Sequence, residues 1–345
     1  MLAHPSLFLF YGLLVFSVLV VLSSDSWFMV WVGLEINVVS FIPLMLVKGN
    51  KYRSEARVKY FLIQAFASVL IMMGALLKVC DWALAEQLLA GGVLLKIGAA
   101  PFHQWLPSLV EGVSWGCLIV LFILQKVGPL VGLSLLLKTR PHYALLYGTI
   151  ICCSLIGRVG GLMRPSLRKI MAYSSITHLG WAISSMLFSD LVWVGYYFIY
   201  GLVVARAVAL FHKEAAFSLN QLMLRSSKAR GLMGARLLSL GGLPPFRGFV
   251  PKFLVRVGLL EHGVYFLFVM LLRGTFLRLF FYIRVVLRGL VLRRKCTGLF
   301  GGAGVDSGVV WLNAVGLLGP SVIFFSLLDF KLSKLWAFKA WKIHV

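Results

Sequence analysis

The stretch Gly98-Ala-Ala-Pro-Phe-His-Gln-Trp-Leu-Pro107 decides the fold, because it recurs without gaps as Gly242-Leu-Pro-Pro-Phe-Arg-Gly-Phe-Val-Pro251. The shared pattern is Gly-x-x-Pro-Phe-x-x-aromatic-aliphatic-Pro. Both copies interrupt long apolar runs, and glycine and proline end or kink helices at such places. Helices interrupted at matching positions of inverted repeats are typical of proteins that bind ions inside the membrane. The alternative interpretation is two coincidental Gly/Pro turns.

The composition around these copies indicates a membrane protein. Hydrophobic residues make up 60% of the 345 residues and charged residues only 13%, whereas soluble domains have about 45–50% and about 25%. Too little polar surface is available to cover a globule in water, which argues against a soluble enzyme. The apolar runs are continuous rather than alternating, so we predict an all-α polytopic bundle and not a barrel.

Apolar runs of about 20 residues are long enough to span a bilayer. We predict about eleven transmembrane helices in a single membrane domain, 1–345. Because the two Gly/Pro copies lie five spans apart, we expect inverted five-helix repeats with broken helices at 1–140 and 141–295, followed by a terminal helix and interfacial tail at 296–345. The predicted spans are 7–22, 27–47, 58–79, 84–100, 113–137, 143–163, 170–189, 191–211, 232–254, 264–283 and 309–328.

The net charge of +23 comes from 34 Lys and Arg residues against 11 Asp and Glu residues. The basic residues concentrate in the loops on the N-terminal side of the bundle, which the positive-inside rule assigns to the cytoplasm or matrix. Membrane topology therefore explains the charge, and we expect no nucleic-acid partner. The sequence contains no phosphate-binding glycine loop, no cysteine cluster and no paired histidines, so we predict no metal and no cofactor in this chain. We also expect no cleaved targeting segment.

Charged residues inside the predicted spans are the strongest functional signal. Each costs about 2.5–3.5 kcal/mol at the bilayer centre, and six unpaired groups would cost on the order of 15–20 kcal/mol. A structural protein gains nothing from this cost, whereas a protein that moves charge through a bundle requires such groups. The residues are Glu35, Lys96, Lys126, Arg158, Arg206 and Lys252.

Glu35, Lys96 and Lys126 suggest proton transfer. Burial in general lowers the pKa of a lysine and a nearby carboxylate raises it, so a lysine whose carboxylate partner approaches or recedes can load and release a proton. We therefore expect Glu35 to pair with a buried lysine. The alternatives are a protonated Glu35 that joins two helices and a Lys96 that extends to the membrane surface.

Lys252 and His178 extend this interpretation. A proline-broken helix exposes backbone carbonyls, and Lys252 can bridge them to a wet cavity or simply cap them. His178 is either a proton relay between lysines or a hydrogen-bonding group against a neighbouring helix. Arg158 and Arg206 keep their charge, so we interpret them as pairing or interface groups.

Several sequence blocks resemble the chain 2 family of NADH–ubiquinone oxidoreductase, the respiratory complex I. They keep the family's order over roughly 27–255, and the His178 and Lys252 blocks are the most specific. The blocks are Trp31-Val-Gly-Leu-Glu35-Ile-Asn37, Glu55-Ala-Arg-Val-Lys59, Lys96-Ile-Gly98, Gln125-Lys126, Tyr173-Ser-Ser-Ile-Thr-His178-Leu-Gly-Trp181 and Gly242-Leu-Pro-Pro-Phe-Arg-Gly-Phe-Val-Pro-Lys252.

The resemblance implies an antiporter-like, proton-translocating subunit of the complex I membrane arm. By position, Glu35 and Lys96 would be the modulating ion pair, Lys126 the central relay and Lys252 the outward relay, with His178 between the last two. It further implies a multi-pass protein of the mitochondrial inner membrane whose partners are the other membrane-arm subunits and the lipid bilayer. NADH, FMN, iron–sulfur clusters and ubiquinone would be bound by other subunits.

The chain departs from the family pattern at Ser108, where an acidic residue is usual. Two other functions stay open at this point. One is a stand-alone cation/proton antiporter of related fold, and the other is a purely structural membrane subunit.

Overall fold

The computed structural model describes residues 5–45, 51–82, 84–139, 143–162, 164–219, 221, 227–244 and 246–291. Among these residues the regular elements are all helices, joined by turns and one isolated bridge between Ser166 and Ser218. The predicted all-α class is confirmed. The helices are α1 (Pro5–Leu22), α2 (Trp27–Leu44), α3 (Lys51–Val79), α4 (Ala85–Ile97), α5 (Trp105–Leu109), α6 (Trp115–Phe122), α7 (Leu124–Thr139), α8 (Tyr143–Leu162), α9 (Leu167–Met186), α10 (Asp190–Lys213), α12 (Ser227–Gly241), α13 (Phe249–Glu261) and α14 (Tyr265–Val291).

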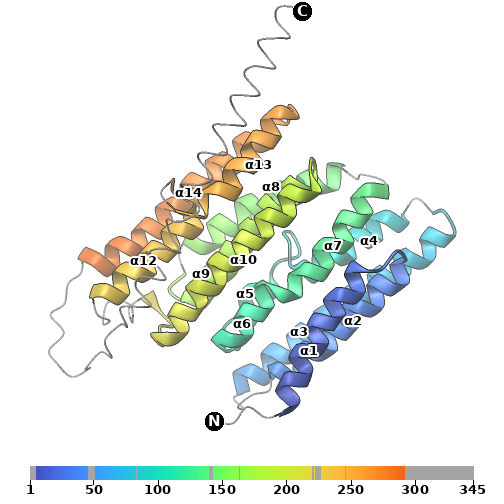
Figure 1. The fold of residues 1–345 in the computed structure, drawn as a ribbon, viewed down its shortest axis with the longest axis horizontal. Helices are drawn as coiled ribbons and strands as arrows, with labels where there is room; N and C mark the ends of the chain where they lie inside the picture. The colour runs from blue at the N-terminus through green and yellow to red at the C-terminus, as the bar shows by residue number, and fades with distance from the viewer. Residues whose placement is uncertain are drawn as a thin grey trace, which may run out of the picture.

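The long helices lie side by side in an elongated array (Figure 1). The N-terminal helices α1, α2 and α3 form one end of the array and α12, α13 and α14 form the other, with α4–α10 between them. Helix α3 packs on α4, α1 on α2, α8 on α9, and α12 on α14. Contacts of α6 with α10 and of α5 with α9 join the two halves of the chain.

Within the described ranges, six helical segments are long and apolar enough to cross a membrane. Their outward faces are apolar as well, for example on α3, where Phe61, Phe66 and Leu76 are 50%, 59% and 55% exposed. Contiguous apolar surface of this kind is stable against lipid and not against water. The segments are Trp27–Leu44, Arg53–Val79, Trp115–Lys138, Ala144–Leu162, Asp190–Lys213 and Tyr265–Arg284, and α1 adds the shorter apolar helix Leu7–Leu22. The predicted span 309–328 and the tail lie outside the described residues.

Both Gly/Pro copies interrupt their helices in the same way. Helix α4 ends at Ile97, where Gly98 takes a φ of 73° and donates its N–H to the Leu94 and Leu95 carbonyls at 3.1 Å. Helix α12 ends at Gly241, and Gly242 with a φ of 82° repeats this geometry. A left-handed residue after a helix favours glycine because it has no Cβ. Helix resumes at Trp105 and Phe249, so the predicted interruptions are confirmed.

The span predicted at 113–137 differs from the structure, because it is divided at Ile123 into α6 and α7. No glycine or proline stands at the division. The hydroxyl of Tyr197 on α10 donates to the carbonyls of Phe122, at 3.3 Å, and Ile123, at 2.7 Å. A side chain distant in sequence thus satisfies carbonyls that a continuous helix would pair internally.

Candidate functional site

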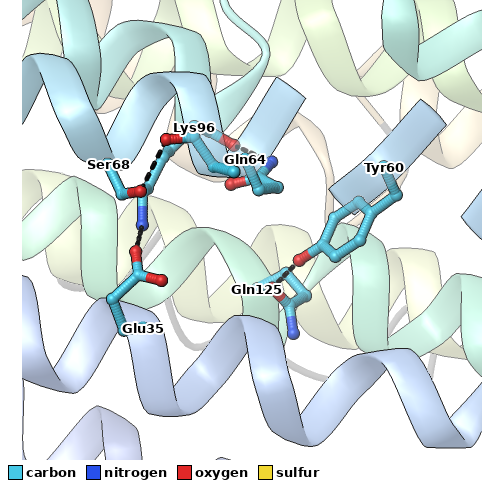
Figure 2. A network of polar contacts seen from close by, with 7 residues as sticks. Glu35, Tyr60, Gln64, Ser68, Lys96 and Gln125 are labelled. Carbon is cyan, nitrogen blue, oxygen red and sulfur yellow. Dashed lines mark hydrogen bonds and ion pairs between the residues drawn. The ribbon is translucent and has the colours of Figure 1, made fainter. Parts of the chain in front are cut away.

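Glu35 and Lys96 form an ion pair between two helices in the first half of the chain. Lys96 Nζ lies 2.9 Å from Glu35 Oε1 (Figure 2). Lys96 is on the last turn of α4, directly before the interruption, and Glu35 is in the middle of α2. The Lys96 side chain is only 2% exposed, whereas that of Glu35 is 31% exposed. The pair therefore has one enclosed partner and one partner at the surface of the chain.

Neutral polar groups surround this pair. Gln64 Nε2 donates to the Lys96 carbonyl at 3.3 Å, which anchors the end of α4 to α3. Figure 2 also shows the hydroxyl of Tyr60 pointing at Gln125, to which it donates at 2.7 Å. Gln125 Nε2 in turn donates to the Asn37 carbonyl at 3.5 Å. These bonds hold α2, α3 and α7 together around the acid–lysine pair.

Lys126 lies at the centre of the molecule, in the first turn of α7, and is 2% exposed. Its ammonium donates to Ser175 Oγ on α9 at 3.2 Å and lies 6.0 Å from the centre of the Phe122 ring. No carboxylate pairs with it among the described residues. The central lysine is therefore held by a hydroxyl, which can bond either the ammonium or the neutral amine, and by an aromatic face, which favours the ammonium.

His178 is one helical turn beyond Ser175 on α9. Its Nδ1 lies 2.7 Å from the Tyr196 hydroxyl, and its ring lies 4.7 Å from that of Tyr200. Nε2 has no hydrogen-bond partner among the described residues, and the Leu240 carbonyl is a neighbour of the ring. A small cavity lies beside the ring, and the space that the centre of a water molecule can occupy in it is about 10 Å³. That is room for about one water.

Lys252 is fully buried in the first turn of α13, the helix that follows the second interruption. Its ammonium donates to the Leu240 and Gly241 carbonyls, both at 2.7 Å, which are the last carbonyls of α12. The charged groups that act on it are all cationic, namely Arg278, Arg256 and Arg158. Lys252 thus caps the C-terminal end of α12, in an environment that contains no carboxylate among the described residues.

The five predicted site residues fall into two groups. Glu35 and Lys96 meet directly. Lys126 and His178 are joined through α9, which carries Ser175 and His178 one turn apart, and His178 and Lys252 share the Leu240 carbonyl as a neighbour. No hydrogen bond or ion pair connects Lys96 with Lys126 in the described part of the chain, although α4 packs on α7.

Sequence reasoning missed Tyr196, Tyr200 and Arg278. The tyrosines recur at helical spacing in α10 and face the histidine, a signal that periodicity could have revealed. Arg278 on α14 is fully buried. Arg158, on α8, is also buried and donates to the Met270 and Leu271 carbonyls at 3.3 and 3.4 Å. Over the described ranges, no group of three His, Cys, Asp or Glu side chains is placed to hold a metal.

Comparisons with known proteins agree with this architecture. A family model described as NADH:quinone oxidoreductase/Mrp antiporter, TM, matches residues 24–81 and 77–278. NADH-ubiquinone oxidoreductase chain 2 of Anopheles gambiae is 39% identical over 289 residues, which cover 80% of this chain and 84% of the relative. That of Aedes aegypti is 38% identical with the same coverage. A chain of respiratory complex I from Thermus thermophilus shares the fold, with a TM-score of 0.74, 22% identity, and coverage of 89% of this chain and 77% of that one. The chain therefore belongs to the family of NADH-ubiquinone oxidoreductase chain 2.

Proposed function

We propose that the chain is a proton-translocating core subunit in the membrane arm of respiratory complex I, in the mitochondrial inner membrane. The observation that carries this proposal is the ion pair between Lys96 and Glu35 beside an interrupted helix. An ion pair with a buried partner contributes little to stability compared with apolar packing, because desolvation offsets the attraction. Its use is a change of state, since moving either partner changes the proton affinity of the other.

In the proposed mechanism, redox work done in other subunits displaces Glu35 relative to Lys96. Lys96 then loses or gains a proton as its partner recedes or approaches. Displacing a charge beside Lys126 changes the proton affinity of that lysine in turn, because electrostatic interactions are strong in a low-dielectric interior. NADH, FMN, iron–sulfur clusters and ubiquinone are bound by those other subunits, and this chain performs no redox chemistry.

The outward half of the route runs along α9. Lys126 contacts Ser175, and the next turn of α9 carries His178 beside a cavity for about one water. Lys252 lies on the far side of the Leu240 carbonyl. Side chains and a water spaced in this way can pass a proton from the central lysine to the outward lysine.

The free energy needed to move a proton across the membrane is comparable with the free energy that a change in the pKa of a lysine can supply. Moving one proton against 100 mV costs about 2.3 kcal/mol. A change of two units in the pKa of a lysine corresponds to about 2.7 kcal/mol. A displacement that moves the acid away from its lysine therefore stores enough free energy for one proton to cross the membrane.

Inverted five-helix repeats within about eleven spans are part of the proposal. Helix pairs recur in the same order in the two halves of the chain: α1 packs on α2 and on α7, and α8 packs on α9 and on α14. Likewise α3 packs on α4 and α5, and α10 packs on α12 and α13. The two interrupted helices occupy equivalent places in this scheme, which supports repeats at 1–140 and 141–295.

The test is Lys126→Met in the assembled complex. We expect NADH oxidation to fall together with proton pumping, because a methionine cannot carry the proton across the centre. Lys138→Met is the matched control, since Lys138 is on the same helix but its side chain is 61% exposed. Undiminished pumping by Lys126→Met would remove this lysine from the route, whereas equal losses in both variants would indicate a general defect of assembly.

A stand-alone cation/proton antiporter is the second candidate, because the matching family model includes Mrp antiporters. The 31% exposure of Glu35 favours the complex, since an ionised group facing lipid is costly and a neighbouring subunit would cover it. Mild detergent extraction separates the two. Migration within a very large assembly supports the complex, and transport by the chain alone in vesicles supports the antiporter.

A further inference from the structure

Arg278 is a buried arginine that makes no hydrogen bond in the described part of the chain. The residue, on α14, is 0% exposed, and its Nε, Nη1 and Nη2 atoms have no partner among the described residues. A guanidinium keeps its charge inside a protein, so burial without an acid or an acceptor is costly. Packing gives no reason to keep such a charge, because an apolar side chain of similar volume is as stable or more stable there.

One face of α14 places Arg278 between a second arginine and the end of α12. Gly274, Arg278 and Tyr282 follow one another at intervals of four residues, so they share a face of the helix. The guanidinium of Arg158, from α8, lies over Gly274, where a Cβ would overlap it. The ring of Tyr282 packs on Gly241, where a Cβ would lie 3.2 Å from Cδ2. Arg278 is thus one turn away from each of these two contacts.

The end of α12 is also where Lys252 is held. Its ammonium donates to the Leu240 and Gly241 carbonyls, both at 2.7 Å. Among the charged groups, Arg278 acts most strongly on this ammonium, and it acts on the His178 ring as well. The ionisable groups of this region are Arg158 from α8, His178 from α9, Tyr196 and Tyr200 from α10, Lys252 and Arg256 from α13, and Arg278 and Tyr282 from α14.

The four cations of this region respond differently to their mutual repulsion. Like charges repel strongly in an interior that screens them poorly. Arginine does not release its proton in proteins, whereas a buried lysine can. Of these cations, only Lys252 can therefore end the repulsion by giving up a proton. An ammonium has three N–H groups, and two of them suffice for the two carbonyls. The neutral amine can thus keep both carbonyls of α12 bonded.

We infer that Arg278 is a positioning residue for proton transfer, whose fixed charge drives the proton from Lys252 to water and disfavours its return through His178. One N–H bond of the ammonium breaks, its electron pair stays on Nζ, and the proton passes to a water molecule. The inference rests on the proposed function, because it assigns a role to Arg278 only if Lys252 carries protons.

The test is Arg278→Met in the assembled complex, reconstituted into vesicles. We expect NADH-driven pumping at about pH 7 to fall about tenfold, the lower end for loss of a charge that faces a buried ionisable group. Pumping should recover as the pH is raised, because lower proton activity then replaces the push of the arginine. Thermal stability should stay the same or rise, since an unpaired buried charge is removed. Lower stability together with a loss of pumping at every pH would overturn the inference and make Arg278 structural.

Arg273→Met is the matched control, since Arg273 is an exposed arginine of the same helix. It should change pumping by less than about twofold. Arg278→Gln is the second variant if Arg278→Met does not assemble, and it should give the same pH profile.

Lys126→Met, measured in parallel, separates this inference from the proposed function. If Lys126→Met stops pumping while Arg278→Met pumps like the unaltered chain at every pH, the role of Arg278 is wrong and the route stands. If Lys126→Met pumps undiminished, the route is wrong, and the role of Arg278 falls with it.

Discussion

The two interrupted helices end in the same turn, but different side chains donate to the carbonyls at their ends. At the first interruption, the indole Nε1 of Trp105 donates to the Leu95 carbonyl at 3.2 Å, and Lys96 is left to pair with Glu35 on another helix. At the second, the residue equivalent to Trp105 is Phe249, whose side chain has no N–H. Lys252 donates instead to the last two carbonyls of α12.

The difference shows how one backbone motif can hold a buried lysine in two ways. Backbone carbonyls at a helix end need a donor wherever they are buried. When a neutral indole supplies it, the neighbouring lysine is available to pair with an acid and to respond when that acid moves. When a lysine supplies it, the ammonium is fixed in place and is surrounded by Arg158, Arg256 and Arg278. Lys96 is therefore held by a side chain that can move, whereas Lys252 is held by backbone carbonyls at a helix end.

The largest expected effect comes from removing the donor at the second interruption. Lys252→Met leaves two buried carbonyls unpaired, at about 1–3 kcal/mol each, so we expect a loss of about 2–6 kcal/mol and little assembled complex. Native electrophoresis measures the yield. Lys252→Arg is the control, because arginine restores the donors but does not release protons. It should recover assembly without recovering pumping, and pumping by this variant would show that Lys252 is structural.

A smaller effect is expected from breaking the ion pair at the first interruption. Glu35→Gln leaves the enclosed Lys96 without its acid, which should destabilise the chain by about 3 kcal/mol, the lower end for a buried pair. Lys138→Gln breaks the exposed pair with Asp190, at 2.9 Å, and should cost about 0–1 kcal/mol. Unfolding of the full chain in mixed micelles compares the two. Similar values would mean that burial of Lys96 adds nothing to the strength of the pair.

The smallest effect is expected from making the first interruption resemble the second. Trp105→Phe removes the donor to the Leu95 carbonyl, for which we expect a loss of about 1–2 kcal/mol. Trp115→Phe is the control, since the buried Nε1 of Trp115 has no partner among the described residues. The same unfolding measurement applies. A loss from Trp115→Phe as large as that from Trp105→Phe would attribute the effect to ring size and not to the hydrogen bond.

Much of the fold could be predicted from the sequence. Apolar runs and the Gly/Pro copies placed the helices and both interruptions, because a lipid-facing helix must satisfy its own backbone and because a left-handed turn favours glycine. The division at Ile123 could not be predicted. It depends on the hydroxyl of Tyr197, which comes from a helix about 75 residues later and reaches the carbonyl of Phe122.

The ionisable residues inside the apolar runs could be identified from the sequence, whereas their contacts could not. Charges in apolar runs stand out because each is costly there. Their partners do not stand out, because Ser175, Tyr196 and Gln125 are common in membrane helices and make no pattern of their own.

The amino-acid order alone thus determined that this chain spans a membrane, where its helices are interrupted and which ionisable groups enter the apolar interior, since each follows from the local cost of placing a group in hydrocarbon. Which of those groups meet was decided by tertiary packing. Lys96 finds an acid, Lys126 a hydroxyl and Lys252 two carbonyls, because electrostatic and hydrogen-bonding contacts depend on distances between helices that no local pattern specifies.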